Sequence, residues 1–210
     1  MTSRVLFVRH GQSEWNALGR WQGQADPPLS ELGRAQARAA AHSLGALDAI
    51  FASDLQRAAE TAAIISSALG VGPVVLDQDL RERDAGEWSG LTRAEIEVKF
   101  PGYLESDRTA FAPERGEPRR PPGWEPDETL LERVLGAVQR IHEALPDGEV
   151  LAVTHGGVIY VLEDHLGGPF HRLANGEGRW IEVDDDKLRL GDRVLLVNDD
   201  GTPVTVPNQL

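Results

Sequence analysis

The alternation of short apolar segments with helical segments is the sequence feature that most limits the fold. Apolar runs rich in β-branched or aromatic residues lie at 5–8, 48–53, 74–76 and 149–154, and helical segments separate them. A strand that returns to the same sheet through a helix runs parallel to its predecessor. We therefore expect an α/β fold of the three-layer αβα sandwich type, with a mostly parallel central sheet and helices on both faces.

The expected helices carry recognisable end signals. Three N-caps are predicted, at Ser30, Thr92 and Thr129, the last two in capping boxes with Glu95 and Glu132. Glycines are expected to end the first two helices, at Gly45 and Gly70. Near the end of the chain we expect a helix over 158–168 and strands at 179–185 and 193–199. A turn at Asp184–Asp186 is expected to join the first of these strands to 187–190.

Residues 112–127 interrupt this pattern with five prolines among charged residues and glycines. Helical periodicity resumes directly after them, so we interpret this segment as an irregular excursion or lid and not as a domain boundary. A length of 210 residues suits one domain. The prediction is therefore a single domain over 1–210, in which the Arg119–Arg120 pair belongs to the loop.

Polar residues follow the predicted strands at the points where the strands end. Arg9 and His10 come after 5–8, and His155 comes after 149–154. Arg57 lies in the first turn after the strand at 48–53. Ligands of open parallel sheets bind beyond the carboxyl ends of the strands, so these four side chains are expected to face one pocket.

The residue types in this set suit a phosphate group. Guanidinium groups bind phosphate through two parallel N–H bonds, and helix N-termini add backbone donors. Gly11 and Gly156 allow the backbone to approach a ligand closely. An imidazole can act as donor, acceptor or nucleophile. A catalytic phosphate site also needs a proton donor for the leaving oxygen, and the residues alone leave Glu82, Asp84 and Glu87 open for that role.

Composition excludes several classes of function. The formal net charge of −13 argues against nucleic acid and anionic membranes as main partners. No cysteine is present, which excludes disulfides, thiolate catalysis and Cys-based zinc sites. The N-terminus lacks a signal-peptide pattern, and no apolar run approaches the roughly 20 residues of a membrane span. We expect a cytoplasmic protein, as a monomer or homodimer.

Four blocks of sequence closely resemble the histidine phosphatase superfamily, which includes the cofactor-dependent phosphoglycerate mutases and many small phosphatases. The blocks occur in the family's order, as "VRHGQSEWNALGRWQGQADPPLSELGRAQA", "ASDLQRAAETA", "LRERDAGEWSGLT" and "VTHGG". One departure concerns the Gly-Glu-Ser or Gly-Glu-Thr triplet that members often carry before the long helix. Asp127-Glu128-Thr129 stands at that place, so the resemblance gives Glu128 no supported substrate role.

The resemblance implies a role for each matching residue. His10 would attack phosphorus and form a phosphohistidine, and Glu82 would protonate the leaving alcohol. Arg9, Arg57 and His155 would hold the non-bridging oxygens. The matching blocks add further substrate-binding positions at Gly11, Asn16, Gln22, Gly23 and Gly156. No metal and no cofactor is implied.

Three functions follow as alternatives. The leading one is a metal-independent phosphomonoester hydrolase that acts on a small phosphorylated metabolite. The second is a phosphoglycerate mutase, which is disfavoured because such enzymes are generally longer and carry a basic insertion in mid-chain. The third is a catalytically idle member that binds a phosphorylated ligand or a protein. The four other histidines are interpreted as structural or exposed; they are His42, His142, His165 and His171.

Overall fold

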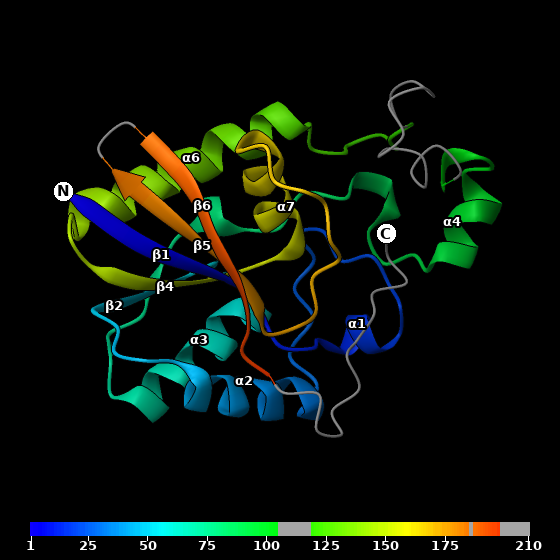
Figure 1. The fold of residues 1–210 in the computed structure, drawn as a ribbon. Helices are drawn as coiled ribbons and strands as arrows, with labels where there is room; N and C mark the ends of the chain where they lie inside the picture. Colours follow the sequence, from blue (N-terminus) through cyan, green and yellow to red (C-terminus); the bar gives the residue numbers. More distant parts are fainter. Residues whose placement is uncertain (105–118, 185–186, 198–210) are drawn as a thin grey trace.

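The computed structural model describes residues 1–104, 119–184 and 187–197 and has one central sheet of six strands, in the order β3-β2-β4-β1-β5-β6 (Figure 1). The strands are β1 (Thr2–Arg9), β2 (Ala49–Ala52), β3 (Val75–Leu76), β4 (Glu149–Thr154), β5 (Glu177–Asp184) and β6 (Lys187–Leu195). Strands β1 to β4 pair in parallel, whereas β5 and β6 add an antiparallel edge beside β1. The mostly parallel sheet is therefore confirmed.

Helices cover both faces of this sheet, as Figure 1 shows. Helices α6 (Asp127–Ala144) and α7 (Gly156–His165) pack on one face, and α2 (Glu31–Ser43) and α3 (Gln56–Leu69) pack on the other. Short elements gather beyond the strand ends: α1 (Glu14–Ala17), α4 (Arg93–Lys99) and the 3₁₀ turns η1 (Gln78–Leu80) and η2 (Gly86–Trp88). The three-layer αβα sandwich expected from the sequence is confirmed.

Strand β1 shows why both faces are covered. Successive side chains of a strand point to opposite faces, so Val5 and Phe7 join the core under α6 and α7. Leu6 and Val8 join the core under α2 and α3. Full burial of such a side chain contributes roughly 1.5–3 kcal/mol. An apolar run without alternation is therefore the expected pattern of a strand covered on both sides.

Helix end signals were mostly predicted correctly. Ser30 caps α2 through the backbone N–H of Gly33, Thr92 and Glu95 form a capping box on α4, and Gly70 ends α3 with a positive φ of 68°. The Thr129 cap is wrong. Helix α6 begins at Asp127 behind Pro126, and no side chain caps it.

The physical reason for this error is local. Proline carries no N–H and has a φ near the helical value, so it suits the start of a helix, and the acidic residues of the first turn favour the positive end of the helix dipole. The strand prediction near the C-terminus also needs correction. Residues 187–190 and 193–195 belong to one continuous strand, β6, which pairs with β5. The register of this pairing shifts between Arg179 and Ile181 of β5.

The described end of the proline-rich segment folds back onto the domain. Trp124 stacks edge-to-face against Trp21 and Trp88, with ring centroids 5.9 Å and 5.4 Å apart. Arg120 lies over the Trp124 ring at 4.6 Å, whereas Arg119 lies 6.0 Å from the Tyr103 ring. The remainder of the predicted excursion, 112–118, lies outside the described residues.

Candidate active site

Two histidines meet at the carboxyl ends of neighbouring strands. His10 follows β1 and His155 follows β4, and these strands pair in parallel with Arg9 opposite Thr154. The two imidazole rings lie edge-to-face with their centroids 5.0 Å apart. Both residues are buried, with exposed fractions of 2% and 0%. The expected convergence of the two strand ends is therefore present in the structure.

Arg57 joins this pair from the first turn of α3. Its Nε donates a hydrogen bond to His10 Nε2 over 3.2 Å. Its two Nη atoms donate to the carbonyl oxygens of Gly23 at 2.9 Å and Ala25 at 2.7 Å. Burial lowers the pKa of Arg57 to about 10, which still leaves the guanidinium charged at neutral pH. One guanidinium thus links the imidazole of His10 to the loop that follows α1.

The hydrogen bonds of His10 define its tautomer. Its Nδ1 lies 2.6 Å from the carbonyl oxygen of Gly11, which can only accept, so Nδ1 carries the proton. Its Nε2 then presents a lone pair to Arg57. Burial, followed by the charges of Arg57 and Arg9, lowers the pKa of His10 well below its ordinary value of 6.5. The imidazole is therefore neutral near pH 7 and holds an available nitrogen lone pair.

Arg9 and His155 complete a buried cluster with His10 and Arg57, which we call the positive pocket. Arg9 is buried and donates through Nη1 to the carbonyl oxygen of Leu173 at 2.6 Å. His155 Nε2 lies 2.9 Å from Ser53 Oγ, and its buried Nδ1 has no hydrogen-bond partner among the described residues. Burial, and then Arg57, lowers the pKa of His155 well below 6.5. Buried polar atoms in proteins almost always have partners, so His155 Nδ1 is a candidate contact for a ligand.

The structure distinguishes among the three carboxylates that are candidates for the proton donor. Glu82 accepts hydrogen bonds from the backbone N–H of Arg83 at 2.8 Å and of Gly157 at 3.2 Å. Gly157 lies in the first turn of α7, which begins directly after His155, so the Glu82 carboxylate lies beside the two histidines. Asp84 is exposed, and exposed Glu87 pairs with Lys99 at 2.9 Å. Glu82 is thus the carboxylate placed next to the pocket.

Three of the predicted positions, Asn16, Gln22 and Gly23, lie in α1 and in the loop that follows it. Gly23 has a φ of 54°, and a Cβ there would lie 2.6 Å from the backbone nitrogen of Ala85. Asn16 closes a capping box with Ser13, whose hydroxyl donates to Gln22 Oε1 at 2.7 Å. These contacts fix the loop whose carbonyl groups hold Arg57.

The two remaining predicted glycines directly follow the two histidines. A Cβ on Gly11 would overlap the backbone of Gly33, and Gly11 N–H donates to Thr61 Oγ1 at 3.1 Å. Gly156 is buried and opens α7, with a hypothetical Cβ 3.4 Å from the Tyr160 ring. Neighbouring backbone therefore excludes a side chain at Gly11, whereas Gly156 makes an ordinary contact.

Several supporting residues could not be found from the sequence. Asn175 Nδ2 donates to the carbonyl oxygen of His10 at 2.8 Å. Thr61 accepts from Gly11 and donates to the Arg57 carbonyl oxygen at 2.7 Å. These groups act on backbone atoms, so no spacing rule points to them. Only Ser53 carried a signal, because it directly follows β2.

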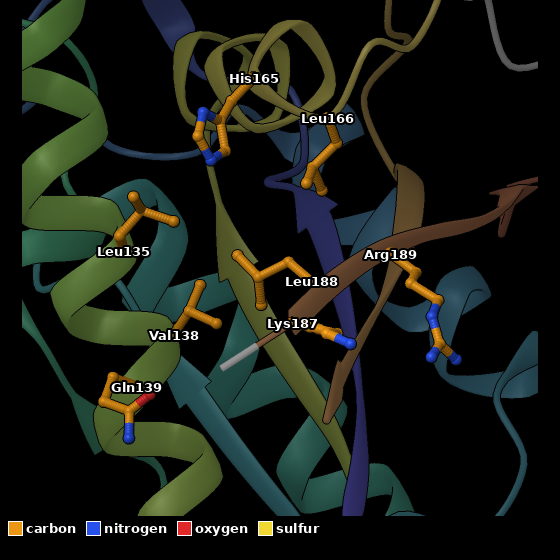
Figure 2. A pocket seen from close by; sticks show the side chains of 8 residues that line it. All are labelled: Leu135, Val138, Gln139, His165, Leu166, Lys187, Leu188 and Arg189. Atoms are coloured by element: carbon orange, nitrogen blue, oxygen red, sulfur yellow. The ribbon is translucent and has the colours of Figure 1, made fainter. Parts of the chain in front are cut away.

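A separate pocket of about 590 Å³ lies between α6, the end of α7 and β6 (Figure 2). It is lined by Leu135, Val138, Gln139, His165, Leu166, Lys187, Leu188 and Arg189. The start of β6 pairs with the end of β5, which lies beside the amino end of β1. This pocket therefore lies at the end of the sheet opposite to His10.

The other histidines lie outside the candidate site. His142 Nδ1 lies 2.8 Å from Ser3 Oγ in the core, whereas His42, His165 and His171 are exposed. Across residues 1–104, 119–184 and 187–197, no group of three or more His, Asp or Glu side chains is arranged to hold a metal ion. In the same part of the chain, no helix has the length and apolar character needed to cross a membrane.

Comparison with known proteins decides the family. Residues 5–191 match the family model of the histidine phosphatase superfamily, branch 1. The chain belongs to the histidine phosphatase superfamily. The resemblance seen in the four sequence blocks is confirmed, and so is the expectation of a phosphatase-family enzyme.

Named phosphatases are among the relatives. The chain is 39% identical over 167 residues to glucosyl-3-phosphoglycerate phosphatase of Mycobacterium tuberculosis, covering 78% of this chain and 74% of that protein. It is 36% identical over 199 residues to a metal-independent phosphoserine phosphatase of Arabidopsis thaliana, covering 93% and 80%. A solved mycobacterial glucosyl-3-phosphoglycerate phosphatase in complex with VO3 superposes with a TM-score of 0.76 at 32% identity, covering 89% and 96%.

The relatives also include proteins that are named as phosphoglycerate mutases. A 2,3-bisphosphoglycerate-dependent phosphoglycerate mutase of Methylobacterium radiotolerans is 36% identical over 176 residues, covering 80% of this chain and 81% of that protein. The identities to the named phosphatases and to the named mutase therefore overlap, at 36–39%.

Proposed function

We propose that this protein hydrolyses phosphomonoesters of small metabolites through a phosphohistidine on His10. The observation that carries the proposal is the state of His10, a neutral imidazole whose Nε2 lone pair lies among the buried cations Arg9 and Arg57. A phosphate dianion would supply the negative charge that this pocket lacks. The nucleophilic nitrogen would then lie beside the phosphorus atom of the bound phosphate group.

In the first step, His10 Nε2 attacks phosphorus while the bond between phosphorus and the ester oxygen breaks. The electron pair of that bond goes to the leaving oxygen, and protonated Glu82 gives it a proton to form the alcohol. Arg9, Arg57 and His155 Nδ1 donate hydrogen bonds to the non-bridging oxygens, where charge develops. The Nδ1–H bond from His10 to the Gly11 carbonyl holds the ring and stabilises its positive charge.

In the second step, Glu82, now a carboxylate, takes a proton from a water molecule whose oxygen attacks phosphorus. The bond between phosphorus and Nε2 breaks, its electrons return to the imidazole, and inorganic phosphate leaves. Glu82 is again protonated and His10 again neutral, so the cycle closes with one ester and one water consumed. We propose that this needs neither metal nor cofactor, because the two guanidiniums and the N-terminus of α7 provide the positive charge.

The substrate class follows from the site and from the relatives together. The described site suits a phosphate group, and phosphate is the feature common to glucosyl-3-phosphoglycerate and phosphoserine, the substrates named for two relatives. The VO3 held by the solved relative is an oxyanion of the kind that this pocket would bind. We therefore propose a small phosphorylated metabolite as substrate and the cytoplasm as location.

A library of phosphorylated metabolites, assayed in EDTA, tests the proposal. We expect phosphate release from a subset of the library and a loss on the order of 10⁴-fold or more for His10→Ala, because no covalent route is left. Activity of His10→Ala near that of the wild type would overturn the proposal. Release of phosphate from 3-phosphoglycerate, compared with formation of 2-phosphoglycerate, distinguishes hydrolase from mutase.

A further inference from the structure

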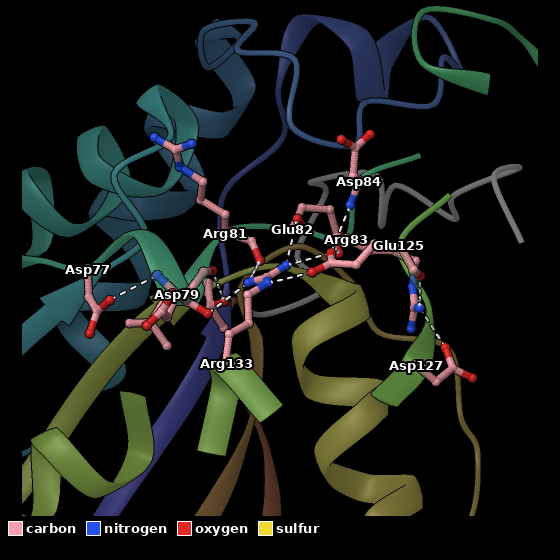
Figure 3. Close-up of polar contacts among 11 residues, drawn as sticks. Asp77, Asp79, Arg81, Glu82, Arg83, Asp84, Glu125, Asp127 and Arg133 are labelled. Carbon is pink, nitrogen blue, oxygen red and sulfur yellow. Dashed lines mark hydrogen bonds and ion pairs between the residues drawn. The ribbon is translucent and has the colours of Figure 1, made fainter. Parts of the chain in front are cut away.

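Arg133 is the most completely hydrogen-bonded side chain near the candidate site. It projects from the second turn of α6 and uses all five of its guanidinium N–H donors (Figure 3). Three of them bind backbone carbonyl oxygens, of Asp79 at 2.8 Å, Arg81 at 2.7 Å and Glu82 at 3.1 Å. The other two bind the carboxylate of Glu125, at 2.7 Å and 2.8 Å. Arg133 therefore holds the backbone of residues 79–82 by hydrogen bonds, up to and including Glu82.

Glu125 hydrogen-bonds to Arg83 and Asp84, the residues that follow Glu82. Its carboxylate also accepts the backbone N–H of Asp84 at 3.0 Å, and its own N–H donates to the Asp84 carbonyl oxygen at 3.0 Å. Its carbonyl oxygen accepts from Arg83 Nη1 at 2.7 Å. The side chains of Glu125 and Arg133 are 11% and 16% exposed, so water screens the pair only weakly.

The pair has more contacts to backbone than a stabilising ion pair requires. Bidentate contact with Glu125 uses two of the five donors of Arg133, and the other three lie on the short loop that carries Glu82. The charge of Arg133 also helps to lower the pKa of His155, which places it in the electrostatic surroundings of the pocket. Burial opposes ionisation of Glu125, but its hydrogen bonds and the charge of Arg133 still lower its pKa.

We propose that Arg133 and Glu125 form a positioning pair that holds the carboxyl group of Glu82 at the leaving oxygen of the substrate. The inference rests on the proposed function, in which Glu82 is the proton donor. Among the described residues, neither member of the pair hydrogen-bonds to the side chains of the positive pocket. Each instead fixes the backbone on one side of Glu82, so that the Glu82 carboxylate keeps its hydrogen bond from the backbone N–H of Gly157. A displacement of about 1 Å at such a group is enough to cost on the order of 10²-fold in rate.

Leaving-group dependence measures this positioning. An aryl phosphate departs as a stable phenolate and needs little protonation, whereas an alkyl phosphate needs a full proton transfer. We propose to measure kcat and KM of Arg133→Lys and Glu125→Gln with p-nitrophenyl phosphate and β-glycerophosphate. Lysine keeps the charge but has three donors in place of five, and glutamine keeps the shape but loses the charge.

Arg140→Gln is the matched control. Arg140 lies on the same helix, and its guanidinium pairs with Asp77 and Asp79 at 2.8 Å and 2.7 Å. It thus binds the start of the same loop, and in the part of the chain that the structure describes it makes no hydrogen bond to the backbone of Glu82. Thermal unfolding of every variant, and the inhibition constant of inorganic phosphate, show whether the fold and the anion pocket are intact.

We expect Arg133→Lys and Glu125→Gln to lower kcat for the alkyl ester about tenfold or more beyond any effect on the aryl ester, with phosphate inhibition unchanged. In a Glu82→Gln background the same substitutions should cause no further selective loss, because the donor is already absent. Equal slowing of both esters, or selectivity that persists without Glu82, would overturn the inference. Failure of the proposed function is distinct, since it would appear as inactivity of the wild type or indifference to His10→Ala.

Discussion

Arg57 Nε and His10 Nε2 lie 3.2 Å apart in a direct hydrogen bond. The N–H that contacts the lone pair of the proposed nucleophile is thus the same group that would bind a phosphate oxygen once substrate arrives. In the free enzyme this bond aligns the imidazole and disfavours its protonation. With substrate present, the guanidinium can transfer that donor to the oxygen while its Nη atoms stay on the carbonyl groups of Gly23 and Ala25.

Arg57→Lys is therefore not a conservative change. An ammonium group cannot contact His10, Gly23 and Ala25 in the same plane, so we expect kcat/KM to fall by about 10²-fold or more, close to the loss for Arg57→Ala. Arg34→Lys is the control, because Arg34 pairs with Glu60 at 2.6 Å away from the histidines. Recovery of most activity by lysine would show that charge alone is required.

The two buried histidines of the candidate site, His10 and His155, predict how stability depends on pH. Their pKa values are lowered in the folded state, so below the ordinary value of 6.5 the unfolded chain binds protons that the folded chain does not. The free energy of unfolding should then fall between pH 7.5 and 5.5, by about 1.4 kcal/mol for each histidine that stays neutral. Urea unfolding in phosphate-free buffers measures this change.

His10→Asn supplies the comparison for this measurement. The substitution removes one of the two buried imidazoles of the site. Between pH 7.5 and 5.5 the free energy of unfolding of the variant should therefore fall by about 1.4 kcal/mol less than that of the wild type. Identical losses in both proteins would mean that His10 is not held neutral by the fold.

Local signals explain how much of the fold could be predicted. Strands β1 and β4 contain the uninterrupted apolar runs 5–8 and 150–153, and Gly70 ends α3 through a backbone conformation that glycine adopts readily. Strand β6 was divided wrongly because its course depends on pairing with β5, and this pairing is not encoded within six or seven consecutive residues. The start of α6 was misplaced because two rules competed, and Pro126 outweighed the capping-box spacing of Thr129.

The candidate site was predictable where side chains follow strands and not where they support backbone. The strand-end rule brought His10, Arg57 and His155 together. Physical reasoning from the residues could not choose among the carboxylates of 82–87, because the choice depends on the N-terminus of α7, far away in the sequence. Asn175 and Arg133 were missed for the same reason, since their partners are carbonyl groups brought near by the fold.

Gly157→Ala tests whether activity needs the hydrogen bond between the Glu82 carboxylate and the first turn of α7. A Cβ at this position would overlap Glu82 Oε1, which is the far end of a flexible side chain and can move away. We expect the melting temperature to be unchanged or slightly raised, because alanine favours the helix, while activity on alkyl phosphates falls selectively. Gly136→Ala in α6, whose Cβ would lie 3.4 Å from Arg140 Nη1, controls for the helix effect. Unchanged activity of Gly157→Ala on alkyl phosphates would remove Glu82 from the acid role.

The positive pocket should bind phosphate without turnover. A ligand that binds only the folded state raises stability by about 2.7 kcal/mol at a concentration of 100 Kd, so inorganic phosphate or vanadate should raise the melting temperature in a saturable manner. EDTA should leave this shift intact if the guanidiniums of Arg9 and Arg57 and the imidazole of His155 provide the binding. His155→Ala should weaken the shift, since it removes the buried Nδ1 that has no partner among the described residues. A shift of the same size in His155→Ala would place the anion elsewhere and contradict the assignment of this pocket.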